Sequence, residues 1–258
     1  MRKLLIIGIG PGDADYVTMQ AVKALNRVDI FFVVDKGSEK DDLVQLRREI
    51  LARYVEAPSY RIVEIADPPR DRRPADYRAT VRAWHQQRAD RYEQAIRDEL
   101  GDDQCGAFLV WGDPALYDST IQIVEEIVRR GNVELTYEVI PGISAVQALV
   151  AKHRITLNRV GEAIQITTGR RLAAGLPDDA ENVVVMLDAG TTFKHVATSD
   201  LDIYWGAYVG TEDEILRSGP VLDVMDEIEH IRGEARARKG WIMDTYLLRR
   251  REEDGSGA

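Results

Sequence analysis

Short apolar runs alternate with longer amphipathic segments through most of the chain. The runs are rich in Ile, Val, Leu and Phe and are bounded by Gly, Pro, Asp or Asn, a pattern that predicts buried strands. We expect strands at Lys3–Ile9, Ile30–Val34, Arg61–Ile65, Ala107–Trp111, Glu134–Ile140, Ala163–Thr168, Val183–Leu187, Ile203–Val209 and Trp241–Leu248. Strands that alternate with helices are typical of an α/β fold.

The segments between these runs carry apolar residues at helical spacing. The first has Val17, Ala21, Leu25 and Val28 on one face, which predicts a helix over residues 16–28. Further helices are expected at 42–54, 75–100, 119–130 and 221–232. The alternation loosens after Pro114. We therefore expect one α/β domain over residues 1–114, a second over 115–250 and a disordered tail over 251–258.

Composition narrows the classes of function. The chain has 258 residues, of which 45% are hydrophobic, and a formal net charge of −10 that argues against a nucleic-acid partner. No apolar segment approaches the roughly 18 residues of a membrane span, and the N-terminus lacks an export signal, so we expect no membrane association and a cytoplasmic location. The single cysteine, Cys105, is expected to be an inert core thiol. The histidines show no metal-ligand spacing, so no metal is expected.

Three of the expected strands end in glycine-bearing turns: Gly10-Pro11-Gly12-Asp13, Trp111-Gly112-Asp113-Pro114 and Ile140-Pro141-Gly142-Ile143-Ser144. The first departs from a dinucleotide-binding loop, because Asp13 replaces its third glycine and Pro11 lacks a backbone N–H for a phosphate. In open α/β sheets, ligands bind beyond the carboxyl ends of the strands. The turns therefore predict a site where backbone meets ligand.

In this order the three turns resemble the S-adenosylmethionine-dependent tetrapyrrole methylase family, which builds the corrin ring of cobalamin and the sirohaem precursor. The resemblance runs from Leu4 to about Arg249. Within the family, residues 24–50, the Asp67-Pro68-Pro69 break and Trp84-His85 are similar to the members that methylate C1 of a precorrin and release its acetyl group as acetate. Another precorrin or uroporphyrinogen C-methyltransferase is the alternative, and a tetrapyrrole carrier without turnover belongs to a different class.

The resemblance implies two α/β domains, each a mixed sheet flanked by helices, with S-adenosylmethionine in the cleft between them. It also implies a homodimer and a precorrin-type tetrapyrrole substrate. The residues that it assigns to the cofactor are Pro11, Trp111, Gly112, Asp113, Leu116, Ser144, Ala145, Leu187 and Gly210. Met186 is an alternative to Leu187. For Asp113, a carboxylate suits a cationic sulfonium, but Asp before Pro is also common in plain turns.

A base is expected to activate the water that removes the acetyl group. Asp35, at the end of the second strand, is the first candidate by the resemblance and Asp13 is the second; either could instead cap a helix. Arginine binds carboxylates with two parallel hydrogen bonds, so a basic cluster in the loop after Pro69 is a candidate for the substrate's acetate and propionate groups. It consists of Arg70, Arg72 and Arg73, and a solvated surface is the alternative.

Overall fold

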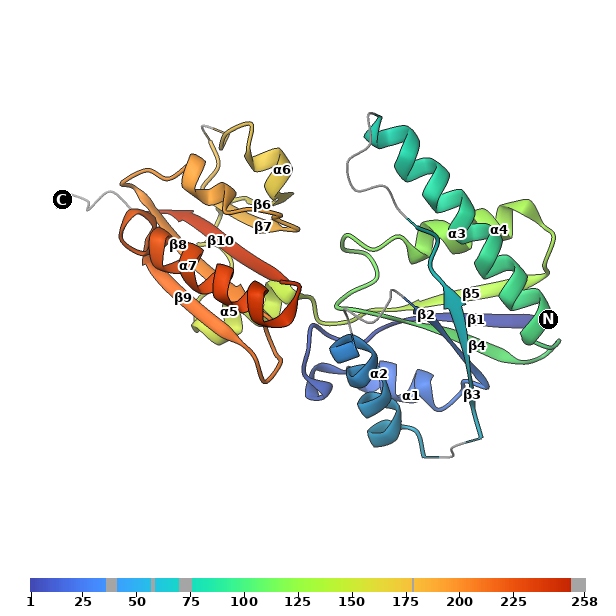
Figure 1. The fold of residues 1–258 in the computed structure, drawn as a ribbon. Helices are drawn as coiled ribbons and strands as arrows, with labels where there is room; N and C mark the ends of the chain where they lie inside the picture. The colour runs from blue at the N-terminus through green and yellow to red at the C-terminus, as the bar shows by residue number, and fades with distance from the viewer. Residues whose placement is uncertain (36–40, 57–58, 70–75, 178, 252–258) are drawn as a thin grey trace. The chain divides into compact units, whose positions relative to one another are not determined.

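The computed structural model describes residues 1–35, 41–56, 59–69, 76–177 and 179–251. The chain forms two compact units, Met1–Ser144 and Ala145–Ala258, and each is a five-stranded sheet covered by helices (Figure 1). Arg70, Arg72 and Arg73 lie outside the described residues, as does the tail expected to be disordered, except for Arg251.

The first unit contains β1 (Arg2–Gly8), β2 (Ile30–Asp35), β3 (Arg61–Ala66), β4 (Cys105–Val110) and β5 (Leu135–Ile140), in the order β3-β2-β4-β1-β5. Every pairing in this sheet is parallel. A mixed sheet was expected here, so that expectation is wrong for the first unit. A parallel sheet joined by helical crossovers is covered on both faces. Because all five strands run in the same direction, their carboxyl ends lie at one edge of the sheet.

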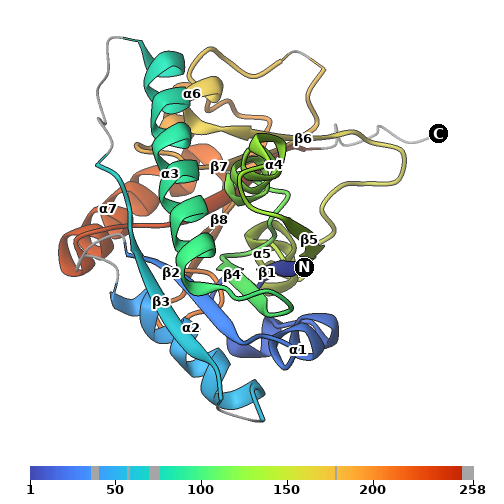
Figure 2. The same cartoon turned by 90° about the vertical axis from the view of Figure 1, so that its right-hand side faces the viewer.

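The strand β1 shows why the sheet needs two helical layers, because its alternating residues enter different cores. Leu5 and Ile7 pack with α1 (Met19–Leu25) and α2 (Asp41–Tyr54), whereas Leu4 and Ile6 pack with α3 (Tyr77–Glu99) and α4 (Thr120–Arg130). Figures 1 and 2 show the two helix pairs on opposite faces of the sheet. Successive strand side chains point to opposite faces, so a continuous apolar run suits this position. A short 3-10 helix, η1 (Ala14–Tyr16), precedes α1.

The boundary between the units follows Ser144 and not Pro114. The physical reason is strand pairing: β5 lies beside β1 with Leu4 opposite Tyr137, and α4 contributes Ile123 and Ile127 to the same core as α3. The segment that follows Pro114 therefore completes the first sheet.

The second unit contains β6 (Ile164–Thr168), β7 (Asn182–Met186), β8 (Leu201–Ala207), β9 (Ile215–Pro220) and β10 (Asp244–Arg250), in the order β6-β7-β10-β8-β9. This sheet is mixed, because only β6 and β7 are parallel. One face packs on α6 (Gly169–Leu172), η3 (Thr192–His195) and α7 (Val221–Lys239), and α5 (Ala145–His153) contacts β8, β9 and β10. The edge strand β9 was not expected, and α7 continues beyond Arg232.

Candidate functional site

The three glycine turns lie side by side at the carboxyl edge of the first sheet, because β4, β1 and β5 are neighbours. The first two are tied by a short antiparallel bridge, in which the Gly112 N–H donates to Gly10 O at 2.8 Å and the Gly10 N–H to Gly112 O at 3.4 Å. The first two turns are thus joined at the position where a site was expected, and contact with a ligand stays a prediction.

The third turn packs so tightly against the others that a side chain cannot fit. A Cβ added to Gly142 would clash with the Gly112 carbonyl oxygen and would lie 2.9 Å from Gly8 Cα. A Cβ added to Gly8 would lie 2.6 Å from Gly142 N. Glycine is therefore required at positions 8 and 142 by close approach of backbone to backbone.

The Asp113 carboxylate joins the second turn to the third. Its Oδ2 accepts from the Gly142 N–H at 2.8 Å, and its Oδ1 accepts from the Ala115 N–H at 2.8 Å. Both oxygens thus accept hydrogen bonds from backbone N–H groups. Asp113 therefore stabilises the turns at the position where a contact with the ligand was expected.

Three more of the residues expected to contact the cofactor, Trp111, Leu116 and Ser144, lie in or just after these turns. The indole Nε1 of Trp111 is buried and has no hydrogen-bond partner among the described residues, although the ring packs against the core beside α1 and α2. Leu116 donates its N–H to Asp113 O at 3.2 Å, and the next residue, Tyr117, has a positive φ of 54°. Ser144 is buried and ends the first unit.

In the second unit, two of the expected residues lie in loops that follow strands. Leu187 directly follows β7, has a φ of 54° and is 64% exposed. Gly210, with a φ of 86°, follows β8, and its N–H donates to Glu214 Oε2 at 2.7 Å. Ala145 is the first residue of α5.

Comparison with known proteins identifies the family. The model of the Tetrapyrrole (Corrin/Porphyrin) Methylases matches residues 3–224. The chain belongs to this family. A curated relative, the precorrin-6A synthase [deacetylating] of Sinorhizobium sp, is 52% identical over 250 residues, which cover 97% of this chain and 96% of the relative.

Two solved structures give the same fold. The cobalamin synthesis related protein CobF from Corynebacterium diphtheriae has a TM-score of 0.85 at 41% identity, and the match covers 98% of this chain and 100% of that one. The uroporphyrin-III C-methyl transferase from Thermus thermophilus, complexed with S-adenosylhomocysteine, has a TM-score of 0.58 at 16% identity and covers 95% and 96%. The latter likeness supports the fold alone.

Two carboxylates are candidates for the catalytic base, and the structure describes the side chain of only one of them, Asp13. Asp13 is the N-cap of η1, and its Oδ1 accepts from the Asp15 N–H at 2.8 Å. The capping alternative for Asp13 is therefore realised. Asp35 is the last residue of β2, at the same edge of the sheet as the turns, but its side chain lies outside the described residues.

The sequence did not reveal a buried arginine that contacts the segment preceding residue 70. Arg88 of α3 donates from Nε to Asp67 Oδ1 at 2.8 Å and from a terminal nitrogen to Ser119 Oγ at 3.1 Å, and its guanidinium lies 4.4 Å from the Trp84 ring centroid. Trp84 Nε1 donates to Pro68 O at 3.1 Å. The segment that leads into Arg70 is thereby fixed to α3 and to the start of α4. The helical spacing of Trp84 and Arg88 was the only signal in the sequence.

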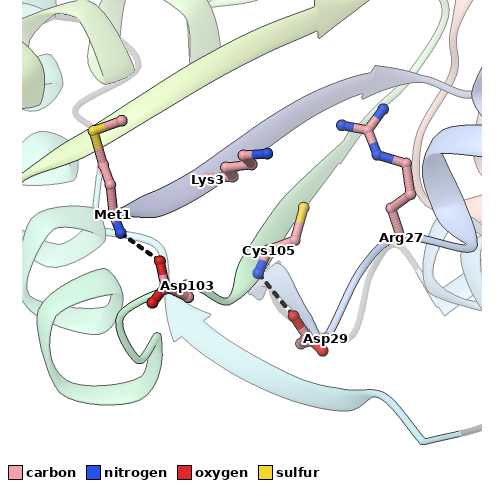
Figure 3. A pocket seen from close by; sticks show the side chains of 6 residues that line it. All are labelled: Met1, Lys3, Arg27, Asp29, Asp103 and Cys105. Carbon is pink, nitrogen blue, oxygen red and sulfur yellow. Dashed lines mark hydrogen bonds and ion pairs between the residues drawn. The ribbon is translucent and has the colours of Figure 1, made fainter.

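A separate pocket lies at the opposite, amino-terminal edge of the first sheet. Figure 3 shows its lining, which includes Lys3, Arg27 and Cys105, and its volume is about 260 Å³. Cys105 is 8% exposed and burial raises the pKa of its thiol, so the expected core position is confirmed, and the inertness of the thiol stays a prediction. This pocket is remote from the turns along the strands and does not belong to the candidate site.

Two further observations concern metals and membranes. Within the described ranges, no group of three or more His, Cys, Asp or Glu side chains is arranged to hold a metal ion. The helices formed by these residues are all too short or too polar to cross a membrane.

Proposed function

We propose that this chain is a precorrin-6A synthase, which transfers a methyl group from S-adenosylmethionine to C1 of precorrin-5 and releases the acetyl group as acetate in aerobic cobalamin biosynthesis. The observation that carries the proposal is the 52% identity to a precorrin-6A synthase over 97% of the chain. The three joined turns at the carboxyl edge of the first sheet support it.

The residues at the turns fit the methyl donor. At Gly112 an added Cβ would meet no heavy atom closer than Ser144 Cα at 3.7 Å, and the unpartnered Trp111 Nε1 is a donor that a ligand acceptor could satisfy. When bound, S-adenosylmethionine supplies an activated methyl group on a sulfonium. On the family resemblance, we assign the contacts of the cofactor to Pro11, Trp111, Gly112, Asp113, Leu116, Ser144, Ala145, Leu187 and Gly210.

The work of these residues is alignment, because methyl transfer from a sulfonium needs no metal ion. The Asp113 charge, held by the Gly142 and Ala115 N–H groups, attracts a cationic donor to the turns. The bridge between Gly10 and Gly112 keeps the first two turns in register during binding.

For the acetyl group we propose hydrolysis before methyl transfer. Asp35 accepts a proton from water, the hydroxide adds to the acetyl carbonyl, and the carbon–carbon bond breaks to give acetate and an electron-rich C1 that takes the methyl. Asp13 is the second candidate, although its cap bond to Asp15 already occupies one oxygen. Arg70, Arg72 and Arg73 bind substrate carboxylates, and the Arg88 contacts to Asp67 and Ser119 support the segment that precedes them.

We further propose a cytoplasmic homodimer that requires no metal ion and associates with neither nucleic acid nor membrane. The net charge of −10 supports the absence of a nucleic-acid partner.

The deciding experiment incubates the purified protein with precorrin-5 and S-adenosylmethionine labelled in its methyl group. We expect label at C1 and one equivalent of acetate for each methyl transferred. Label at another carbon, or methylation of uroporphyrinogen III in a parallel incubation without acetate, would assign the chain to a different methylase. A calorimetric titration that finds no saturable S-adenosylhomocysteine binding would favour the carrier.

A further inference from the structure

Leu187 holds a backbone conformation that its residue type disfavours. Its φ of 54° lies in the left-handed region, where a side chain with a Cβ crowds the backbone, and it is 64% exposed, so no apolar burial compensates. Such outliers persist only where the surrounding structure over-determines them. The contacts of the next residue, Asp188, supply that constraint.

The Asp188 side chain is 6% exposed and accepts four hydrogen bonds. Its Oδ1 accepts from Thr192 Oγ1 at 2.7 Å and from the Gly190 N–H at 3.1 Å. Its Oδ2 accepts from the Thr192 N–H at 2.9 Å and from the Tyr246 hydroxyl at 2.8 Å. Burial and this carboxylate raise the pKa of Tyr246, which therefore stays protonated as a donor.

The backbone of Asp188 is held as well. Arg232 of α7, 6% exposed, donates from a terminal nitrogen to Asp188 O at 2.8 Å and from Nε to Asp244 Oδ2 at 2.9 Å. Asp244 Oδ2 also accepts from Trp205 Nε1 at 3.1 Å. The guanidinium is thus fixed by β10 and β8 before it reaches the loop.

The space for the carboxylate is provided by a glycine. A Cβ added to Gly169 would lie 2.5 Å from Asp188 Cγ and 2.8 Å from its Cα. Gly169 directly follows β6, the strand next to β7. We name Asp188, Thr192, Arg232, Asp244 and Tyr246 the Asp188 cluster.

Leu187 therefore lies between two fixed points. On one side, Met186 is paired in the sheet with Thr168 and Thr245, and on the other the carboxylate and carbonyl of Asp188 are both held. We propose that Asp188 and Arg232 are positioning residues, which hold Leu187 in its left-handed conformation so that its exposed side chain is presented to the methyl donor. This proposal rests on the cofactor contact assigned to Leu187 above.

The test compares S-adenosylhomocysteine affinity by calorimetry in variants of the full chain. Leu187→Ala checks the cofactor contact itself. Asp188→Asn keeps the size of the side chain but loses acceptors, and we expect roughly tenfold weaker binding, the effect of losing one hydrogen bond to a charged group. Asn182→Ala is the matched control: Asn182 is also buried and hydrogen-bonded, to Glu162 and Arg249, but lies at the opposite end of β7. Its affinity should stay that of the unmodified protein.

A double-variant comparison separates positioning from general stability. In the Leu187→Gly background the left-handed conformation needs no support, so adding Asp188→Asn should not weaken binding further. The KM for precorrin should remain unchanged in Asp188→Asn. If Asp188→Asn does not fold, Tyr246→Phe removes one donor to the carboxylate and should weaken binding about threefold.

The outcomes are distinguishable. Unchanged affinity in Leu187→Ala would remove the assigned cofactor contact and the positioning proposal with it. Weaker binding in Leu187→Ala with unchanged affinity in both Asp188→Asn and Tyr246→Phe would overturn the positioning role alone. Equal losses from Asp188→Asn in the Leu and Gly backgrounds, or an equal loss in Asn182→Ala, would also overturn it.

Discussion

Replacing Gly142 by alanine tests whether the three turns form one rigid unit. The added Cβ would clash with the Gly112 carbonyl oxygen and would lie 2.9 Å from Gly8 Cα. Favourable contacts begin at about 3.3 Å between carbon and oxygen and at about 3.5 Å between two carbons. The turn must therefore move by on the order of 1 Å, because both clashing groups are backbone. That shift breaks the 2.8 Å bond from the Gly142 N–H to Asp113 Oδ2. Overpacking and the lost bond together cost about 2–4 kcal/mol of unfolding free energy.

The assay is thermal unfolding together with calorimetric binding of S-adenosylhomocysteine. A loss of this size lowers Tm by roughly 5–15 °C in a chain of this length. Gly101→Ala is the control, since its Cβ would first meet the flexible Gln104 Oε1 at 3.1 Å, and it should change neither quantity appreciably. If Gly142→Ala melted within about 1 °C of the unmodified protein and bound S-adenosylhomocysteine equally well, the three turns would not form one rigid unit on which ligand binding depends.

Three further predictions follow from individual contacts. Leu187→Gly should be more stable than Leu187→Ala by about 1 kcal/mol in urea unfolding, the reverse of the usual order, because only glycine relieves the positive φ. Burial lowers the pKa of His153 below its unfolded value of about 6.5, so stability should fall as pH drops through 6.5, and His153→Gln should flatten that slope in a Tm–pH series. Arg88→Met should cost about 3–5 kcal/mol by stranding Asp67, and Arg88→Met with Asp67→Leu should recover most of it.

The strands and helices of the first unit were largely predictable from sequence. Continuous apolar runs identified β1 and β4, and the spacing of Val17, Ala21, Leu25 and Val28 identified the buried face around α1. Each signal is local and is set by burial. The ends were less accurate: Thr18 caps α1 with a side-chain bond to the Ala21 N–H, and the segment before it forms η1.

The division of the chain was not predictable in the same way. Whether β5 joins the first or the second sheet depends on pairing with β1, a contact between residues far apart in sequence. The edge strand β9 has no continuous apolar run, since Arg217, Ser218 and Gly219 interrupt it, and it is held by its ladder with β8. Pairing of this kind overrides local propensity.

The candidate site shows the same contrast between local and distant signals. The glycine turns were visible as motifs, but the double use of the Asp113 carboxylate by Ala115 and Gly142 was not. Arg88 and Arg232 read as ordinary charged helix positions, because their partners Asp67 and Asp244 lie on other elements. Buried polar pairs are fixed by tertiary structure, and sequence spacing gives little information about them.

The two units fix the loops to which we assign cofactor contacts by different physical means. In the first, bare glycine backbone packs against itself, and a carboxylate closes the gap between turns. In the second, larger residues hold left-handed conformations beside polar anchors: Leu187 precedes Asp188, and Tyr208, with a φ of 49°, donates its N–H to Met243 O and its hydroxyl to Trp241 O. A methyl transfer that depends on alignment favours loops with little conformational freedom. Both arrangements restrict the backbone of the free protein, which lowers the entropy cost of ordering these loops when a ligand binds. The affinity of the donor should therefore depend more on these anchors than on any single side chain that touches it.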